Sequence, residues 1–325
     1  MTRVAAIDCG TNSIRLLVAD ARMEEGPLGS HPVLSDLTRQ MRIVRLGQGV
    51  DRTGVLDHAA IERTLEAVGE YRGMIEHLGA ERIRFVATSA TRDASNRDVF
   101  AQGVRELLGV DPEVVPGTEE ASLSFRGAVT GVDRSLPRPL LVVDIGGGST
   151  ELVLGSDDVE QAISINMGSV RVTEKFLAGG DPEKGVDAEA ERRALAWIDA
   201  RLDEAEASVD LSAVGTLVGV AGTVTTITAQ ALGLTSYQPE RIDGASLDMD
   251  GVHEAIRFMV DQPVAVKAAL GFMPEGRQDV IAAGALIWDR VIARVVARTG
   301  LAGHGIDHVL TSEHDILDGI ALSMV

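Results

Sequence analysis

Two short turns, far apart in the chain, have the residue types of a phosphate-binding loop. The first is Asp8-Cys9-Gly10-Thr11-Asn12-Ser13, and the second is Asp144-Ile145-Gly146-Gly147-Gly148-Ser149-Thr150-Glu151. Glycine has no Cβ, so the backbone N–H groups of such a turn can approach the oxygens of a phosphate. The acid that starts each turn can hold a cation, directly or through water. Together the two turns predict that this chain grips a phosphorylated ligand.

Each turn lies between two apolar runs, which is the pattern of a buried β-hairpin. The runs are residues 4–7 and 14–19 around the first turn, and residues 140–143 and 152–154 around the second. Aligning Asp8 with Asp144 also aligns Gly10 with Gly146. The near repeat therefore indicates a duplicated α/β domain with mixed sheets, and the proline- and arginine-rich stretch 134–139 is the best candidate for the linker.

The segments between the hairpins predict alternating strands and helices. Asp57 precedes a long amphipathic segment that ends at Gly79, so we expect a capped helix there. Further strands are expected at 42–46, 83–87, 113–115, near 163, 217–220 and 309–311. Further helices are expected at 98–108, from near 118, and at 170–177, 188–207, 223–232, 251–259 and 277–298, with a last helix after 311.

Composition and charge exclude several classes of protein. A chain of 325 residues suits two domains, and with 3% aromatic residues their cores must be built from Val, Leu, Ile and Ala. The formal net charge of −19 argues against binding to nucleic acid or to an acidic membrane surface, and an anionic ligand would need local compensation by cations. The single cysteine, Cys9, cannot form an intramolecular disulfide and is expected to be a small buried residue. We identify neither a secretion signal nor an apolar run of about 20 residues, so we expect a cytoplasmic protein.

Three further segments could bind or activate a phosphate. Arg92 ends the polar turn 88–92 and could form a forked contact with phosphate oxygens, or it could be an exposed loop arginine. Glu119 and Glu120 start a helix, where neighbouring side chains point in different directions, so only one of them can face a site. Glutamates at a helix start can also simply compensate the helix dipole. The turn 219–223 leads from a strand into a helix and could bind an anion or be a plain tight turn.

Taken in order, these motifs closely resemble those of the exopolyphosphatase / guanosine pentaphosphate phosphohydrolase family of the actin-like ATPase superfamily. The resemblance extends over essentially the whole chain, and the octapeptide 144–151 is its most diagnostic part. It implies an α/β fold of two ribonuclease-H-like domains with mixed sheets and an interdomain cleft. The last helix would pack back on the first domain, so the domains would comprise residues 1–133 with 308–325, and residues 138–307.

The resemblance also implies a role for each matching position. Glu120 matches the catalytic glutamate of the family and Arg92 its phosphate-gripping arginine, whereas Glu119 is only a neighbour. Asp144 and Glu151 match the acids associated with the metal. The expected metal ligands are therefore Asp144, Glu151 and Asp8. The expected phosphate-binding residues are Gly10, Thr11, Asn12, Ser13, Gly146, Gly147, Gly148, Ser149, Gly222 and Thr223.

The activity implied is hydrolysis of the terminal phosphoanhydride of inorganic polyphosphate, with Mg²⁺ or Mn²⁺ and a monovalent cation as the candidate cofactors. Longer members of the family append helical domains, so short polyphosphates are the expected substrates here. Many members also have an arginine ahead of an acid–glycine pair, where this chain has Leu317. The alternatives are a guanosine pentaphosphate hydrolase, an actin-like or sugar-kinase-like ATP-binding protein, and a silent regulator that binds polyphosphate. The resemblance also makes a homodimer plausible.

Overall fold

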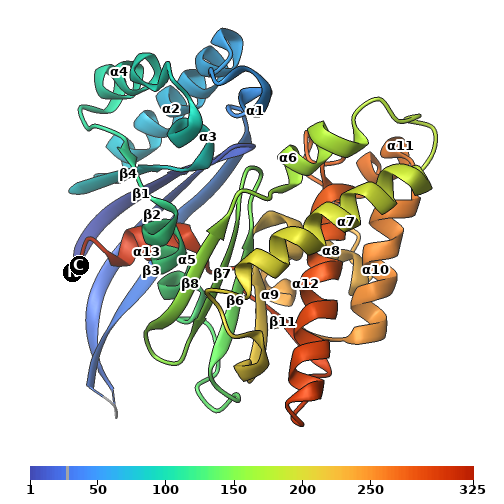
Figure 1. Ribbon diagram of the computed structural model, residues 1–325. Coiled ribbons are helices and arrows are strands. Elements are labelled where there is room, and N and C mark those ends of the chain that lie inside the picture. Colours follow the sequence, from blue (N-terminus) through green and yellow to red (C-terminus); the bar gives the residue numbers. More distant parts are fainter. Residues whose placement is uncertain (27–28) are drawn as a thin grey trace. The chain divides into compact units, whose positions relative to one another are not determined.

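The computed structural model describes residues 1–26 and 29–325, which form two compact units. Unit 1 comprises Met1–Gly127 and Asp315–Val325, and unit 2 comprises Ala128–His314. Each unit has its own sheet, helices and hydrophobic core (Figure 1). We expected residues 308–325 to return together to the first domain. The strand at 308–311 instead pairs within the sheet of unit 2, so the chain returns to unit 1 only at Asp315.

Unit 1 is built on a mixed five-stranded sheet with the order β3-β2-β1-β4-β5. Its strands are β1 (Thr2–Cys9), β2 (Ser13–Gly26), β3 (Gly29–Ile43), β4 (Arg82–Ala87) and β5 (Glu113–Val114). Strands β1 and β2 form the first expected hairpin, and their register sets Asp8 opposite Arg15. Strand β4 runs parallel to β1, with Ala87 opposite Cys9. The segment that follows β4 therefore begins beside the first loop.

Strand β3 corrects the strand expected at 42–46. It starts at Gly29 and ends at Ile43, and Arg45 then adopts a left-handed backbone conformation with a φ of 52°. The strand lies at the edge of the sheet and contains Pro32, which lacks the N–H needed by a central strand. An edge strand is largely polar, so hydrophobic alternation did not reveal it.

The helices of unit 1 cover both faces of this sheet. They are α1 (Val50–Thr53), α2 (His58–Leu78), α3 (Ser89–Asp93), α4 (Arg97–Leu108), α5 (Gly117–Ala128) and α13 (Ile316–Leu322). Helix α2 is capped as expected, because the Asp57 carboxylate accepts from the N–H of Ala60. Residues of α2 and α4 share a buried cluster with one face of β1, and residues of α13 share another with its opposite face. Helix α13 approaches α5 so closely that a Cβ on Gly319 would lie 1.9 Å from the carbonyl oxygen of Leu123.

Unit 2 contains a mixed six-stranded sheet with the order β10-β11-β9-β6-β7-β8. Its strands are β6 (Leu140–Ile145), β7 (Thr150–Gly155), β8 (Val159–Ile165), β9 (Thr216–Val220), β10 (Ser246–Asp248) and β11 (His308–Thr311). Strands β6 and β7 form the second expected hairpin, with Asp144 opposite Glu151. Strand β9 is parallel to both β6 and β11, so these three strands end at the same edge of the sheet. Ligands of α/β sheets commonly bind at such an edge.

The helices of unit 2 pack around a core that includes the buried Trp288. They are α6 (Ser169–Val172), a π-helical turn (Thr173–Leu177), α7 (Ala188–Ala205), a 3₁₀ turn (Leu211–Ala213), α8 (Ala221–Ala231), α9 (Pro239–Ile242), α10 (Met249–Asp261), α11 (Val264–Ala268) and α12 (Ile281–Leu301). Helix α12 begins four residues later than expected, because residues 277–280 form a turn closed by the N–H of Val280 on the carbonyl of Arg277. Within residues 1–26 and 29–325, no helix has both the length and the apolar character needed to cross a membrane.

Candidate active site

The two predicted phosphate loops adopt the same turn. In the first, the N–H of Gly10 donates to the carbonyl of Ser13 at 2.9 Å, and in the second the N–H of Gly146 donates to the carbonyl of Ser149 at 3.0 Å. Each turn joins two antiparallel strands that stay paired up to the turn. The two loops are therefore equivalent in conformation as well as in sequence.

Three carbonyl groups of the second loop accept hydrogen bonds from one neighbouring segment, residues 169–171. The bonds run from Ser169 N to Gly146 O (2.9 Å), from Val170 N to Gly147 O (2.9 Å) and from Arg171 Nε to Gly148 O (2.9 Å). In a trans peptide the N–H points opposite to the preceding carbonyl. The N–H groups of residues 147–149 therefore point away from that segment, and such a row of amides forms an anion-binding concavity.

The first loop is braced in a comparable way by the segment after β3. The carbonyl of Asn12 accepts from the N–H groups of Val44 (2.9 Å) and Arg45 (2.8 Å), and the carbonyl of Thr11 accepts from Gly47 (2.9 Å). By the same trans-peptide argument, the N–H groups of residues 12 and 13 point to the opposite side. The loop is thus held in place by its carbonyls, which leaves its amides oriented for a ligand.

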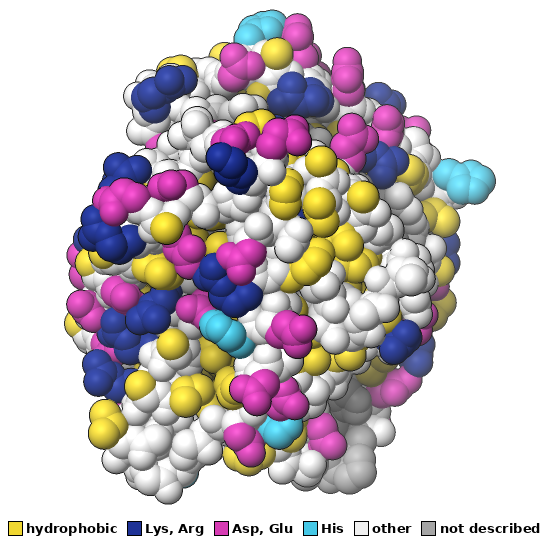
Figure 2. Space-filling model, turned by 90° about the vertical axis from the view of Figure 1, so that its right-hand side faces the viewer, with side chains coloured by type: hydrophobic (Ala, Val, Ile, Leu, Met, Phe, Trp, Pro, Cys, Tyr) yellow, Lys and Arg dark blue, Asp and Glu magenta, His cyan; other side chains and the backbone are white. Residues whose placement is uncertain are grey.

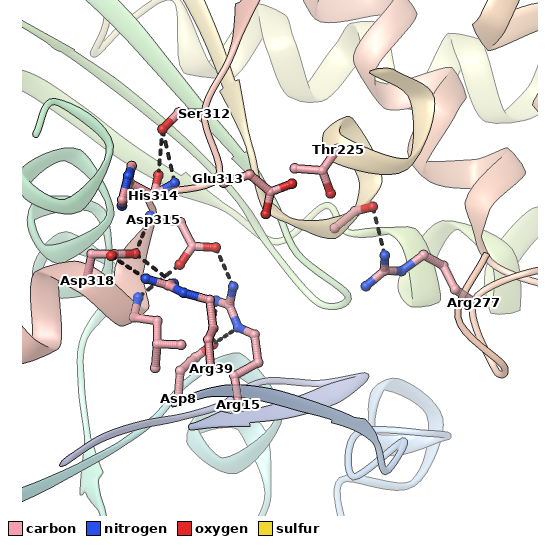
Figure 3. Close-up of polar contacts among 12 residues, drawn as sticks. Asp8, Arg15, Arg39, Thr225, Arg277, Ser312, Glu313, His314, Asp315 and Asp318 are labelled. Atoms are coloured by element: carbon pink, nitrogen blue, oxygen red, sulfur yellow. Dashed lines mark hydrogen bonds and ion pairs between the residues drawn. The ribbon is translucent and has the colours of Figure 1, made fainter. Parts of the chain in front are cut away.

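Arg15 forms an ion pair with Asp8, the acid that starts the first loop. Its Nε and Nη2 donate to Oδ2 of Asp8 at 3.0 and 2.7 Å, and its Nη1 donates to the carboxylate of Asp315 (Figure 3). Burial raises the pKa of the Asp8 carboxyl, and the charge of Arg15 opposes that effect. Sequence analysis missed Arg15, although its place opposite Asp8 follows from the register of the predicted hairpin. Cys9 is buried as expected, and burial raises the pKa of its thiol.

Asp315 and Asp318 anchor the start of α13 on unit 1. The carboxylate of Asp315 caps α13 by accepting from the N–H of Leu317 at 3.0 Å. Asp318 accepts two hydrogen bonds from Arg39, at 2.6 and 3.0 Å (Figure 3). Although burial favours the neutral guanidinium, the hydrogen bonds and charge of Asp318 raise the pKa of Arg39. Leu317, which replaces the arginine common in the resembled family, is buried in the core under α13.

Two acids, Asp144 and Glu151, flank the second loop, whereas an acid and an arginine, Asp8 and Arg15, flank the first. Glu151 lies opposite Asp144, at the position that Arg15 occupies in the first hairpin. Both carboxylates are buried, and the hydroxyl of Ser164 donates to Glu151 at 2.6 Å. Carboxylates directly opposite on paired strands repel one another. This pair is therefore better suited to holding a cation than the Asp8–Arg15 pair.

Glu120 and Arg92 are brought together in unit 1. Nη1 of Arg92 donates to Oε2 of Glu120 at 3.1 Å and to the carbonyl of Val115 at 3.0 Å. The Glu120 side chain is 9% exposed, whereas that of Glu119 is 43% exposed and pairs with Arg84 instead. The two neighbouring glutamates therefore have different partners, and Glu120 is the one beside Arg92.

In unit 2 the turn after β9 leads into α8 at Gly222 and Thr223. Ala221, the first residue of the helix, has a left-handed backbone with a φ of 66°. Nη1 of Arg277 donates to the carbonyl of Gly222 at 3.1 Å and to Thr226 Oγ1 at 3.0 Å. A Cβ on Gly222 would lie 2.2 Å from Nη2 of Arg277, so glycine permits this contact. Sequence analysis missed Arg277, because it expected residue 277 inside a helix.

Arginines compensate the negative charge locally at these loops. The chain has 49 acidic and 30 basic residues, and on the face drawn in Figure 2 the two kinds are intermixed. Arg15 lies at the first loop, Arg92 beside Glu120, and Arg277 at the start of α8. Each unit therefore supplies cationic donors close to the groups expected to face phosphate.

Comparisons with known proteins show the family and the fold of this chain. The sequence model of the Ppx/GppA phosphatase family matches residues 24–300. Exopolyphosphatase 2 of Mycobacterium tuberculosis is 44% identical over 329 aligned positions, which cover all of this chain and 99% of that protein. A crystal structure of an exopolyphosphatase-like protein matches with a TM-score of 0.91 and 43% identity, covering 99% of this chain and 98% of the other. The Aquifex aeolicus member of the Ppx/GppA family matches with a TM-score of 0.75 and 28% identity, covering 99% and 97% of the two chains. The expected two-domain actin-like fold is confirmed.

Proposed function

This chain belongs to the Ppx/GppA phosphatase family, and from that premise we propose that it is an exopolyphosphatase that releases orthophosphate from the end of inorganic polyphosphate. The observation that carries the proposal is the contact between Glu120 and Arg92 beside the first loop. A largely buried glutamate can accept a proton from an attacking water, and an arginine beside it can stabilise negative charge on the phosphate. The identity with a protein named exopolyphosphatase supports the same choice.

Glu120 is proposed as the base that takes a proton from the attacking water. Hydrolysis needs a water in line with the terminal phosphorus, an acceptor for its proton, and positive charge near the equatorial oxygens. The hydrogen bond from Arg92 fixes one carboxylate oxygen of Glu120. Both hydrogen bonds described for Arg92 use Nη1, and a guanidinium has five N–H donors, so Arg92 can also donate to a phosphate oxygen.

Each of the two loops is proposed to bind a phosphate of the substrate through its backbone amides. The amides of residues 12–13 and 147–149 are oriented away from the segments that brace the loops. The turn at Gly222 and Thr223, with Arg277 beside it, would add donors for a further phosphate. Binding along several phosphates explains how a chain with a net charge of −19 can hold a polyanion.

Asp144 and Glu151 are the residues that fit Mg²⁺. They are buried, face each other across β6 and β7, and offer the carboxylate oxygens that Mg²⁺ prefers. Among residues 1–26 and 29–325, no three His, Cys, Asp or Glu side chains gather into a metal cluster. Two carboxylates suit Mg²⁺, which commonly keeps several waters and substrate oxygens as its other ligands. When bound, the cation would neutralise charge on the phosphates. In unit 1, Asp8, which is held twice by Arg15, would hold a cation through water.

Substitution of the base tests the mechanism. Glu120→Gln keeps the shape of the side chain but removes its basicity, so we expect turnover to fall by at least about 100-fold. Binding of polyphosphate, measured by isothermal titration, should stay within about threefold of wild type. Glu76→Gln is the control, because Glu76 is exposed on α2 and takes no part in the proposed chemistry. Near wild-type turnover by Glu120→Gln would refute the assignment.

A substrate panel tests the activity itself. Phosphate release should be measured from short polyphosphate, long polyphosphate, guanosine pentaphosphate and ATP, each with Mg²⁺, Mn²⁺ or chelator, and with and without K⁺. We expect metal-dependent release from polyphosphate, with short chains preferred. Faster release from guanosine pentaphosphate would favour the alternative substrate, and release from ATP alone, or none at all, would overturn the proposal.

A further inference from the structure

Arg84 connects the start of α5 to three other parts of unit 1. It lies in β4 with a side chain that is 17% exposed. Its Nη2 donates to Oε1 of Glu119 on α5 at 2.7 Å and to Oε2 of Glu113 on β5, also at 2.7 Å. Its Nε makes a second bond to Glu113 at 3.0 Å, and its Nη1 donates to the hydroxyl of Ser323, directly after α13, at 2.7 Å. The hydrogen bonds to Glu113 and Glu119, and the charges of these two residues, raise the pKa of Arg84.

The two glutamates at the start of α5 are therefore each held by an arginine from the same stretch of chain. Arg84 in β4 holds Glu119, and Arg92, in α3 directly after β4, holds Glu120. Successive side chains on an α-helix are about 100° apart around its axis. A contact at Glu120 alone constrains the first turn of α5 in one direction. The second contact, at Glu119, constrains it in another direction as well.

An ordinary surface ion pair would not have this consequence. Exposed pairs between long side chains contribute about 0–1 kcal/mol and are mobile. Arg84 differs because its side chain is only 17% exposed and its donors go to three separate segments, namely β5, α5 and the residue after α13. A planar guanidinium with several fixed acceptors has little freedom to move. Arg84 can thus hold the first turn of α5 at a fixed position relative to the sheet.

We propose that Arg84 and Glu119 are positioning residues that aim the carboxylate of Glu120 at the attacking water. This inference rests on the proposed function, in which Glu120 is the base. The role of Glu119 is then to hold the first turn of α5, which carries Glu120, through its bond with Arg84. Loss of the Arg84–Glu119 contact should misplace a catalytic group without removing it, and misplacement by less than 1 Å costs on the order of tenfold in rate.

A double-mutant cycle on polyphosphate hydrolysis tests the inference. The variants are Arg84→Met, Glu119→Gln and the double substitution, with Glu76→Gln as the matched control. Glu76→Gln weakens another arginine–glutamate pair of unit 1, which Glu76 forms with Arg72 on α2. We expect each single variant and the double variant to lower kcat by the same factor, about tenfold, with KM changed less than about twofold. Glu76→Gln should leave kcat within about twofold of wild type.

The cycle distinguishes positioning from a direct charge effect and from a purely structural role. If the charge of Glu119 acted directly on Glu120, Arg84→Met and Glu119→Gln would change kcat in opposite directions, and the proposal would be wrong. A purely structural role would lower the unfolding free energy in Arg84→Met and Glu119→Gln and leave kcat unchanged, which would also overturn it. Wild-type turnover and Glu120→Gln report on the proposed function separately. An inactive wild type would overturn both proposals, whereas an active wild type with an unchanged Arg84→Met kcat would overturn only this one.

Discussion

Lys267 is a buried cation whose replacement should stabilise unit 2. It lies on α11, is 3% exposed, and donates one hydrogen bond, at 3.1 Å, to the carbonyl of Met259 near the end of α10. Burial lowers the pKa of Lys267 from 10.5 to about 8, and the charge of Asp279 only partly offsets that effect. The charged amine is therefore less favourable in the folded protein than in the unfolded chain.

The expected size of the effect follows from this pKa. Each pKa unit corresponds to about 1.4 kcal/mol, so charging Lys267 in the fold costs about 3 kcal/mol more than in the unfolded chain. Lys267→Met keeps most of the apolar stem but leaves the Met259 carbonyl without its donor, which costs about 1 kcal/mol. We therefore expect Lys267→Met to raise the unfolding free energy by about 2 kcal/mol at neutral pH.

The advantage of Lys267→Met should disappear at alkaline pH. Between about pH 8 and pH 10.5 the unfolded chain holds a proton on Lys267 that the folded protein has lost. The stability of the wild type therefore rises with pH across this window, and that of the variant lacks this contribution. Above about pH 10.5 the amine is neutral in both states, and the variant should be less stable by the value of the lost hydrogen bond.

Urea unfolding of both proteins at closely spaced pH values, followed by circular dichroism, measures this difference. Lys184→Met is the control, because Lys184 is 77% exposed and pairs with Asp181 across 3.4 Å. Its difference from wild type should stay within about 0.5 kcal/mol at every pH. The reasoning is refuted if Lys267→Met is less stable than wild type at neutral pH, or if the gap between them does not narrow from pH 8 to pH 10.5.

Two further substitutions should change stability through the packing of unit 1. In the part of the chain that the structure describes, the fully buried hydroxyl of Thr91 has no hydrogen-bond partner, so Thr91→Val should raise the unfolding free energy by about 1 kcal/mol. Gly319→Ala should lower it by about 3 kcal/mol or more, since the new Cβ would lie 1.9 Å from a backbone oxygen of α5 and force α13 away. Denaturant unfolding measures both.

Each of these substitutions has a control of the same chemistry. Thr64→Val removes an equally buried hydroxyl that donates to Ala60 at 2.7 Å, so it should destabilise by about 1 kcal/mol. Gly73→Ala places a Cβ in open space on α2 and should stabilise by roughly 0.5–1 kcal/mol. Equal effects of Thr91→Val and Thr64→Val, or of the two glycine variants, would contradict the packing arguments.

The parts of the site that could be predicted from the sequence are those that depend on residues close together in the chain. An acid, a glycine-rich turn and flanking apolar runs are enough to define both hairpins, and the cap at Asp57 follows the same local rules. Most of strand β3 was missed because its sequence, which includes Pro32, shows no regular alternation of apolar and polar residues. The start of α12 was misplaced because residues 277–280 have the composition of a helix but form a turn.

Contacts between distant segments could not be predicted. Arg15 bonds Asp315, which lies 300 positions later, and Arg84 bonds residues of α5 and beyond α13. Such partners are set by the packing of whole elements, which single-sequence patterns do not contain. The strand at 308–311 shows the same limit, because nothing local distinguishes pairing with β9 from pairing in the first sheet.

The return of α13 to unit 1 has a consequence for the synthesis of the protein. One face of the first sheet, including Val4, Leu17 and Val86, is buried under Ile316 and Ile320 of α13. The two segments of unit 1 are synthesised at different times. A ribosome that adds roughly 5–20 residues per second needs about 10–40 s to synthesise residues 128–315, which follow the first segment. During that time α13 does not cover the apolar face. The nascent chain therefore exposes a hydrophobic surface that a chaperone would have to protect from aggregation. Unit 2, which is continuous, can finish folding before unit 1 although it is made later.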